Sequence, residues 1–166
     1  MSQDPVAYRV GIGTDLHRIE RGGPLRLGGV EVDFDSHLAG HSDGDVVLHA
    51  VVDALLGAAG LPDIGERFGD DDPSFKGADS AKLVGQVVAD LTGRGWKVGN
   101  VDLVIHAERP KLSVYKEAMR CRIAALLRVL PAAVGIKAKT HEGTDAIGRG
   151  EAMACTCVVG LMTIDR

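Results

Sequence analysis

Hydrophobic and polar residues alternate along several short stretches of the chain, and this period of two is typical of β-strands. Tyr8 to His17 shows the pattern first, and it returns over residues 96–107, 134–140 and 151–163. Residues 25–27 and 30–34 are shorter extended segments that meet at Gly28 and Gly29, a pair typical of a hairpin turn. The pattern therefore predicts a β-sheet with at least one hairpin.

Continuous apolar runs predict the helices. The longest run, Val46 to Leu56, predicts a helix that ends near residues 57–60, and Ser42 followed by Asp45 has N-cap spacing. Further helices are predicted over residues 79–92 and 113–130, which are followed by glycines and by a proline. The intervening residues 61–77 contain too many prolines, glycines and acidic residues for regular structure, as is typical of a ligand-binding loop.

Strands and helices interleave, but the short breaks between strands indicate hairpins beside crossovers. We therefore predict an α+β fold with a mixed β-sheet and helices packed on one face. The 166 residues fit a single domain over residues 8–166, preceded by a flexible tail over residues 1–7.

The amino-acid composition argues against some classes of binding partner. Hydrophobic residues make up 45% and charged residues 25% of the chain, which are values of ordinary globular proteins. A net charge of -4 lacks the basic character of a nucleic-acid-binding protein. No apolar run approaches the roughly 20 residues that span a bilayer, and the N-terminus lacks the apolar core of a signal peptide. We predict a cytoplasmic protein without nucleic-acid or membrane partners.

The cysteines predict no disulfide framework. There are three, Cys121, Cys155 and Cys157, an odd number in a chain without a secretion signal. We interpret them as small core residues rather than as metal ligands.

Three residues form a candidate metal site. Asp15 and His17 are two apart on a predicted strand, so their side chains share one face. His49 lies among apolar residues of the predicted helix, and with the first two it gives three ligands and one open position, the pattern of catalytic zinc. Asp53, four residues later, is predicted to accept the other ring proton of His49. A solvent-facing polar pair and a core histidine are the alternatives.

The residues 41–45, His-Ser-Asp-Gly-Asp, combine an imidazole, a hydroxyl and free amides at a predicted helix N-terminus, which favours an anion such as phosphate. A simple N-cap explains the same residues. Lys111, Lys137, Lys139 and Arg149 are further candidates for phosphate or base contacts. Gly11 and Gly13 lack the remaining glycine of a dinucleotide-binding motif.

These residues resemble those of the 2-C-methyl-D-erythritol 2,4-cyclodiphosphate synthases of the non-mevalonate isoprenoid pathway, from about Arg9 to Met162. The most specific matching blocks are residues 13–17 (GTDLH), 41–45 (HSDGD) through His49 to Asp53, 63–65 (DIG), 68–73 (FGDDDP), 75–80 (FKGADS), 99–102 (GNVD), 110–111 (PK) and 148–151 (GRGE). The resemblance implies a homotrimer of α+β subunits with active sites between neighbouring subunits.

The resemblance also implies ligands and roles for individual residues. Asp15, His17 and His49 would bind Zn²⁺ or another divalent ion, and Glu142 would bind Mg²⁺ or Mn²⁺ together with the substrate diphosphate. His41 and Thr140 would be catalytic. The implied substrate-contacting residues are Asp15, His17, His41 and Ser42 at the phosphates; Asp63, Ile64 and Gly65 at the ribose; Phe68, Gly69, Asp70, Asp71 and Asp72 at methylerythritol; Ala107, Pro110, Lys111, Leu112 and Ser113 at cytosine; and Lys139, Thr140, His141, Glu142, Ala146 and Arg149 around the diphosphate and the trimer cavity.

The implied reaction converts the cytidine-diphosphate substrate, 4-diphosphocytidyl-2-C-methyl-D-erythritol 2-phosphate, to 2-C-methyl-D-erythritol 2,4-cyclodiphosphate and CMP. The 2-phosphate attacks the β-phosphate, and because both groups are anionic, cations must neutralise their repulsion. Two alternatives differ in class: a non-catalytic trimer that binds a nucleotide or an isoprenoid diphosphate, and a metal-dependent phosphohydrolase.

One segment departs from the family pattern. Many members carry Thr-Thr-Thr or Thr-Thr-Asn and then Leu-Gly-Phe, whereas residues 139–146 of this chain are KTHEGTDA, similar to the plant-type branch. Ala146 replaces the expected Phe, which affects a hydrophobic contact and the lining of the trimer cavity, where Arg149 and Glu151 would bind an isoprenoid diphosphate.

Overall fold

A five-stranded mixed sheet forms the centre of the molecule. The computed structural model describes residues 7–40, 42–69 and 79–164, and the strand order in the sheet is β4-β1-β7-β5-β6. Only β5 and β6 pair in parallel; the other neighbours are antiparallel. The strands are β1 (Tyr8–Arg21), β4 (Ser36–Leu38), β5 (Trp96–His106), β6 (Val134–Lys139) and β7 (Ala152–Thr163), and a separate hairpin joins β2 (Leu25–Leu27) to β3 (Val30–Val32).

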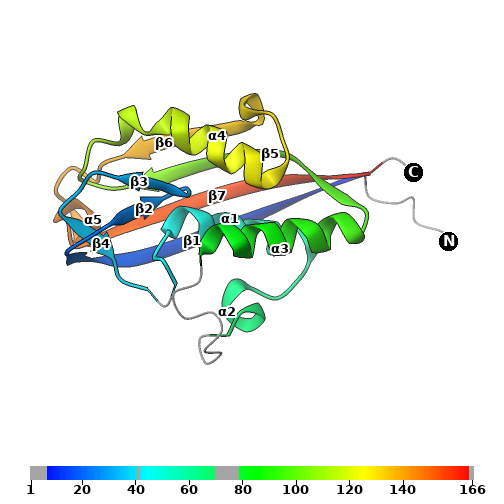
Figure 1. The fold of residues 1–166 in the computed structure, drawn as a ribbon, viewed down its shortest axis with the longest axis horizontal. Helices are drawn as coiled ribbons and strands as arrows, with labels where there is room; N and C mark the ends of the chain where they lie inside the picture. Colours follow the sequence, from blue (N-terminus) through cyan, green and yellow to red (C-terminus); the bar gives the residue numbers. More distant parts are fainter. Residues whose placement is uncertain (1–6, 41, 70–78, 165–166) are drawn as a thin grey trace.

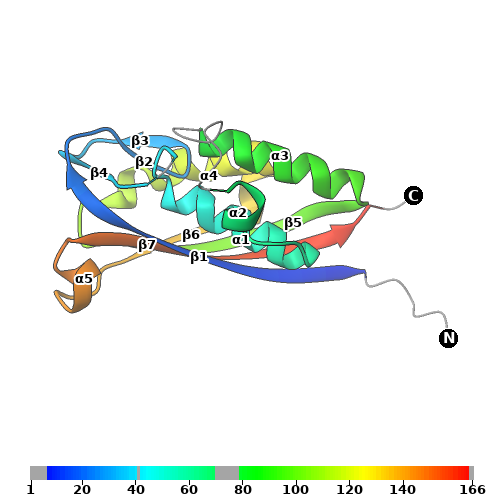
Figure 2. The same cartoon turned by 90° about the horizontal axis from the view of Figure 1, so that it is seen from below.

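The three long helices cover one face of this sheet (Figures 1 and 2). They are α1 (Val46–Ala59), α3 (Ser80–Gly93) and α4 (Lys116–Leu127); the short helices are α2 (Ile64–Arg67) and α5 (Asp145–Gly148), with 3₁₀ turns at Leu112–Val114 and Pro131–Ala133. The predicted single-domain α+β fold, with a mixed sheet and helices packed on one face, is confirmed. None of the described helices is long and apolar enough to cross a membrane.

Two glycines allow α1 to pack directly on β1. A Cβ atom at Gly11 would lie 2.1 Å from the carbonyl oxygen of Ala54, and one at Gly13 would lie 2.1 Å from that of Ala50. Any side chain would therefore push the helix off the strand. Asp15 and His17 continue on the same side of β1, which brings them beneath α1 and its His49.

The opposite face of the sheet carries exposed apolar side chains. Tyr8 is 69% exposed and Ile12 is 65% exposed, although both are large hydrophobic residues of β1. The exposed large hydrophobic residues of this face are Tyr8, Val10, Ile12 and Leu16 of β1 with Val158 and Met162 of β7. A continuous apolar patch on paired strands is typical of a surface that another protein covers.

Several predicted boundaries were wrong. The N-cap of α1 is Asp45 rather than Ser42, because the Asp45 side chain accepts hydrogen bonds from the amides of Val47 and Leu48. β1 continues to Arg21 since β4, a strand too short for a visible pattern, pairs with its end. The region predicted to be irregular contains the one-turn helix α2, which Asp63 caps. The last long helix begins only at Lys116.

The prediction that the cysteines are core residues holds for two of them. Cys155 and Cys157 are buried in β7, and burial raises the pKa of the Cys157 thiol to about 12. Cys121 is exposed on α4, so the prediction was wrong for this residue. The three thiols are free.

Candidate metal centre and active site

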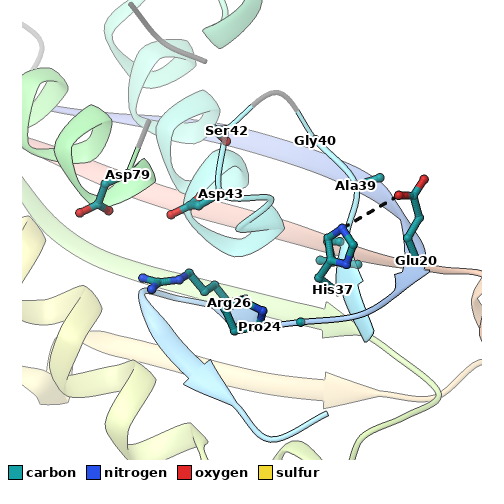
Figure 3. A pocket seen from close by; sticks show the side chains of 11 residues that line it. Glu20, Pro24, Arg26, His37, Ala39, Gly40, Ser42, Asp43 and Asp79 are labelled. Atoms are coloured by element: carbon teal, nitrogen blue, oxygen red, sulfur yellow. Dashed lines mark ion pairs between the residues drawn. The ribbon is translucent and has the colours of Figure 1, made fainter. Parts of the chain in front are cut away.

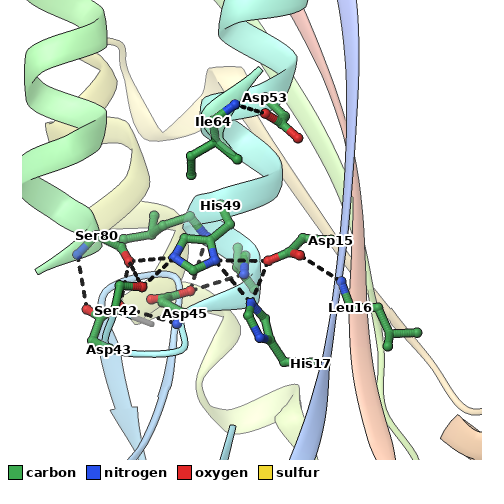
Figure 4. A network of polar contacts seen from close by, with 12 residues as sticks. Asp15, Leu16, His17, Ser42, Asp43, Asp45, His49, Asp53, Ile64 and Ser80 are labelled. Atoms are coloured by element: carbon green, nitrogen blue, oxygen red, sulfur yellow. Dashed lines mark hydrogen bonds and ion pairs between the residues drawn. The ribbon is translucent and has the colours of Figure 1, made fainter. Parts of the chain in front are cut away.

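Asp15, His17 and His49 bring three possible ligand atoms together between β1 and α1 (Figure 4). Oδ2 of Asp15 lies 2.8 Å from Nε2 of His17 and 2.9 Å from Nδ1 of His49, and the two nitrogens are 3.1 Å apart. Ligands at about 2.0 Å from a tetrahedral zinc ion are separated by about 3.3 Å. The triangle therefore has nearly the size of one face of a zinc tetrahedron.

The outer nitrogens of both histidines contact protein groups. Nδ1 of His17 lies 2.5 Å from the carbonyl oxygen of Ala39, which can only accept, so this nitrogen carries the proton. Nε2 of His49 lies 3.0 Å from the hydroxyl of Ser80, and that hydroxyl donates to Asp43. Ser80 therefore accepts from His49. These contacts hold each ring with its inner nitrogen towards Asp15, as in metal-binding histidines.

The charges of the cluster suit a divalent cation. Burial by itself would raise the pKa of Asp15, but hydrogen bonds with His17 and His49 outweigh it and hold this pKa well below its usual range. Burial alone would lower the pKa of His17, whereas the hydrogen bond and charge of Asp15 raise it. One carboxylate and two imidazoles fit zinc or a similar ion, which each imidazole would bind in its neutral form.

The predicted role of Asp53 was wrong. Its Oδ1 accepts a hydrogen bond of 2.8 Å from the backbone amide of Ile64, and the outer nitrogen of His49 instead contacts Ser80 and, at 2.8 Å, Ser42. Asp53 lies one helical turn after His49, whereas the outer nitrogen of His49 faces the loop before α1 and the start of α3. Asp53 connects α1 to α2, which carries the predicted ribose residues Ile64 and Gly65.

Sequence reasoning gave Ser80 no role of its own. The side chain is fully buried at the first residue of α3, and both its amide and its hydroxyl donate to Asp43. Asp43 lies in the loop before α1, so this pair joins the starts of two helices around His49. The only signal in the sequence was the position of Ser80 inside the family block of residues 75–80.

Replacing Ser80 by alanine is expected to weaken zinc binding by about 10–100-fold, because the imidazole of His49 loses the buried one of the two hydroxyls that fix its orientation. Equilibrium dialysis against Zn²⁺ measures the affinity. The matched control is Asp53→Asn, which keeps the oxygen that accepts from Ile64 and should change the zinc affinity little. If Asp53→Asn lowered the zinc affinity as much as Ser80→Ala does, Asp53 would be the residue that orients His49.

The N-terminus of α1 does not offer the free amides that were predicted to bind an anion. The fully buried carboxylate of Asp45 accepts hydrogen bonds from Gly28 and Gly29 of the hairpin and from Val47 and Leu48 of the helix. The protein's own anion thus occupies this position. A phosphate near the start of α1 would have to contact side chains such as Ser42, which is partly exposed.

A pocket of about 800 Å³ opens beside this loop (Figure 3). Ser42 and Asp43 connect it to the metal cluster, and Arg26 reaches into it from the hairpin. Its lining residues are Glu20, Gly23, Pro24, Arg26, His37, Leu38, Ala39, Gly40, Ser42, Asp43 and Asp79. The pocket provides room for a small molecule next to the three candidate ligands.

The predicted cytosine and diphosphate segments meet at the ends of β5 and β6. The amide of Ala107 donates to the carbonyl of Lys139 at 3.0 Å, so the predicted cytosine and diphosphate segments are neighbours. Thr140 donates to the exposed carboxylate of Glu142 at 2.8 Å. Asp15 and His17 lie on the helix-covered side of the sheet, whereas Lys139, by its alternation with buried Ile136, lies on the opposite side.

Other predicted residues have varied surroundings. Lys111 and Ser113 are exposed, while the side chains of Leu112 and Phe68 are buried in the core. Ala146 is partly buried in α5, and Arg149 forms a two-armed ion pair with Glu151 at 2.8 and 3.0 Å. His41, Asp70, Asp71 and Asp72 lie outside the described residues.

Comparison with known proteins shows the family of the chain. The family model described as the YgbB family matches residues 8–162, nearly the whole chain. The chain belongs to the YgbB family.

Curated relatives define the kind of enzyme. A 2-C-methyl-D-erythritol 2,4-cyclodiphosphate synthase of Gemmatimonas aurantiaca is 49% identical over 94% of this chain and 94% of its own length. The synthase of Bordetella avium is 50% identical over 92% and 94%, and the chloroplastic synthase of Catharanthus roseus is 47% identical over 95% of this chain and 66% of its own length. The chain is thus an enzyme of the 2-C-methyl-D-erythritol 2,4-cyclodiphosphate synthase type.

Solved structures share the same architecture. The bifunctional IspDF of Campylobacter jejuni superimposes with a TM-score of 0.91 at 40% identity, and the match covers 95% of this chain and 43% of that longer one. IspF of Plasmodium falciparum, in complex with CDP, gives a TM-score of 0.84 at 30% identity over 96% and 98% of the two chains. The likeness therefore extends over the whole described domain.

Proposed function

We propose that the enzyme converts 4-diphosphocytidyl-2-C-methyl-D-erythritol 2-phosphate to 2-C-methyl-D-erythritol 2,4-cyclodiphosphate and CMP. The observation that carries the proposal is the triangle of Asp15, His17 and His49 ligand atoms, with its outer nitrogens already bonded to protein. Three protein ligands leave one coordination position for the substrate. The names of the full-length relatives, and the CDP in one related structure, support the same substrate class.

The residues have distinct roles in this mechanism. The attacking group is the substrate's own 2-phosphate, so no protein nucleophile is needed, and the protein positions two anions in line. A divalent ion bound by Asp15, His17 and His49 would act as a Lewis acid towards the β-phosphate. We assign His41 and Thr140 to the charge that develops in the transition state, and Glu142 would hold a Mg²⁺ or Mn²⁺ ion that neutralises phosphate charge.

We further propose that three chains assemble and form active sites between neighbouring subunits. The exposed apolar face of β1 and β7 supports an assembly that covers it. Within one chain the metal ligands and Lys139 belong to opposite sides of the sheet. An active site would therefore take its zinc group from one chain and the segments Ala107–Ser113 and Lys139–Glu142 from another. Native mass analysis of the assembled protein tests the trimer.

One incubation separates the three candidate functions. The purified protein is mixed with 4-diphosphocytidyl-2-C-methyl-D-erythritol 2-phosphate and a divalent ion, and the products are separated by mass. Cyclic diphosphate with equimolar CMP supports the synthase. Linear cleavage products would show a phosphohydrolase, and binding without turnover would show a non-catalytic nucleotide-binding protein.

A further inference from the structure

A second pair of histidines lies where the parallel strands β5 and β6 end. His106 is the last residue of β5 and pairs in register with Lys139 of β6. His141 comes after Lys139 and Thr140 in the chain. Nδ1 of His106 is 2.9 Å from Nε2 of His141, and the ring centroids are 5.1 Å apart. The corresponding values for the two histidines of the first cluster are 3.1 Å and 5.2 Å. The two pairs are thus spaced almost identically.

Asp145 determines which nitrogen of His141 faces His106. One carboxylate oxygen accepts from the amides of Ile147 and Gly148 at 2.8 and 3.0 Å, which anchors it at the start of α5. The other oxygen lies 2.7 Å from Nδ1 of His141. The proton of His141 therefore sits on Nδ1, and the lone pair of Nε2 points towards His106. A carboxylate behind the imidazole is a common arrangement in metal-binding histidines.

We propose that Nδ1 of His106 and Nε2 of His141 form a second site for a divalent transition-metal ion such as Zn²⁺. Without the ion, His106 donates its Nδ1 proton to His141. Moving that proton to Nε2 of His106 is a change of tautomer that releases no proton, and it leaves two lone pairs facing one point. Imidazole nitrogens suit zinc, nickel, cobalt and copper, and water or a phosphate oxygen can complete the coordination.

The neighbouring residues fix the segment that carries His141 and relate the pair to a distinctive part of the sequence. The carboxylate of Glu108 lies 3.2 Å from the backbone amide of His141, beside the histidine pair. His141 and Asp145 both belong to the segment 139–146 that departs from the family pattern, so the site belongs to this type of sequence. The proposal rests on this geometry and not on the proposed cyclisation.

The test uses the assembled protein with the first cluster disabled by His17→Ala and His49→Ala. In equilibrium dialysis against Zn²⁺ this variant is expected to bind about one ion per chain. Adding His106→Gln should weaken that binding at least about tenfold, since one of two imidazole ligands is lost, and Asp145→Asn should weaken it about 10–100-fold. Asparagine keeps the oxygen that caps Ile147 and Gly148, so α5 is preserved. Visible absorption of bound Co²⁺ checks that nitrogen ligands are involved.

The matched control is His37→Gln, a partly exposed histidine of β4 that lies 4.0 Å from Glu20 and should leave the zinc affinity unchanged. No binding of Zn²⁺ or Co²⁺ to the disabled variant would overturn the proposal, as would equal affinity with and without His106. If His106→Gln does not fold, Asp145→Asn decides, and an unchanged affinity in that variant rejects the site. Cyclisation is not the readout, so this result is independent of the proposed reaction.

Discussion

Replacing His49 by alanine is expected to abolish tight zinc binding and to lower turnover by more than about a hundredfold while the protein still assembles. The substitution removes one corner of the ligand triangle and leaves Asp15 and His17, which cannot form the three-ligand site by themselves. The loss should appear mainly in kcat, because the ion acts on charge that develops in the transition state. Metal content by elemental analysis and steady-state kinetics on the same sample measure both effects.

A control variant shows whether the effect comes from loss of a metal ligand or from loss of any histidine. His37→Ala removes a partly exposed imidazole from the neighbouring strand β4, outside the ligand triangle, and should leave the zinc content near that of the unmutated enzyme. Circular dichroism and native mass analysis confirm that both variants fold and assemble. Full zinc content together with normal activity in His49→Ala would refute the assignment of the metal site.

The candidate metal ligands could be predicted because the local sequence pattern determines their geometry. A period of two places Asp15 and His17 on one face of a strand, and the histidine within an apolar helical run must lie at the packed side of that helix. The glycines of β1 then bring strand and helix into direct contact. Local periodicity and close packing together bring three residues separated by up to 34 positions into one cluster.

The partners of these ligands could not be predicted in the same way. Helical spacing suggested Asp53 for His49, but the structure gives this role to Ser80, 31 residues away at the start of another helix. Asp45 was recognised only as part of a capping pattern, although its carboxylate also binds two amides of a hairpin. Such contacts depend on tertiary packing between loops, which periodicity does not encode.

Contacts between subunits also cannot be predicted from the local sequence pattern. Alternation in β1 predicts that its apolar side is buried, but the structure buries the side of Gly11 and Gly13 and leaves the large apolar side chains on the exposed side. The sequence pattern cannot tell whether the outer apolar side faces solvent or another chain. The proposed sharing of one active site between two subunits came from the family resemblance, and it can be tested by combining two inactive parents.

Mixing subunits that carry His49→Ala with subunits that carry Lys111→Ala is expected to restore activity that neither parent shows. The zinc group and the exposed Lys111 would belong to different chains in each site. Lys111→Ala should chiefly raise the KM for the cytidine-diphosphate substrate, because a cytosine contact is shared by ground and transition states. The assay therefore keeps the substrate well below that raised KM, so that both parents are nearly inactive.

The expected recovery follows from how two types of subunit distribute around a ring. Each shared site takes its zinc half from one chain and its nucleotide half from the next, and random assembly at equal ratio gives both unmutated halves in about a quarter of the sites. Dissociation, mixing and reassembly should therefore restore about a quarter of the activity of the unmutated enzyme. Dilution of either variant alone should restore none. Active sites built within single chains predict no recovery at any mixing ratio. Mixed trimers that native mass analysis confirms, but that are no more active than their parents, would therefore show that each chain forms its own site.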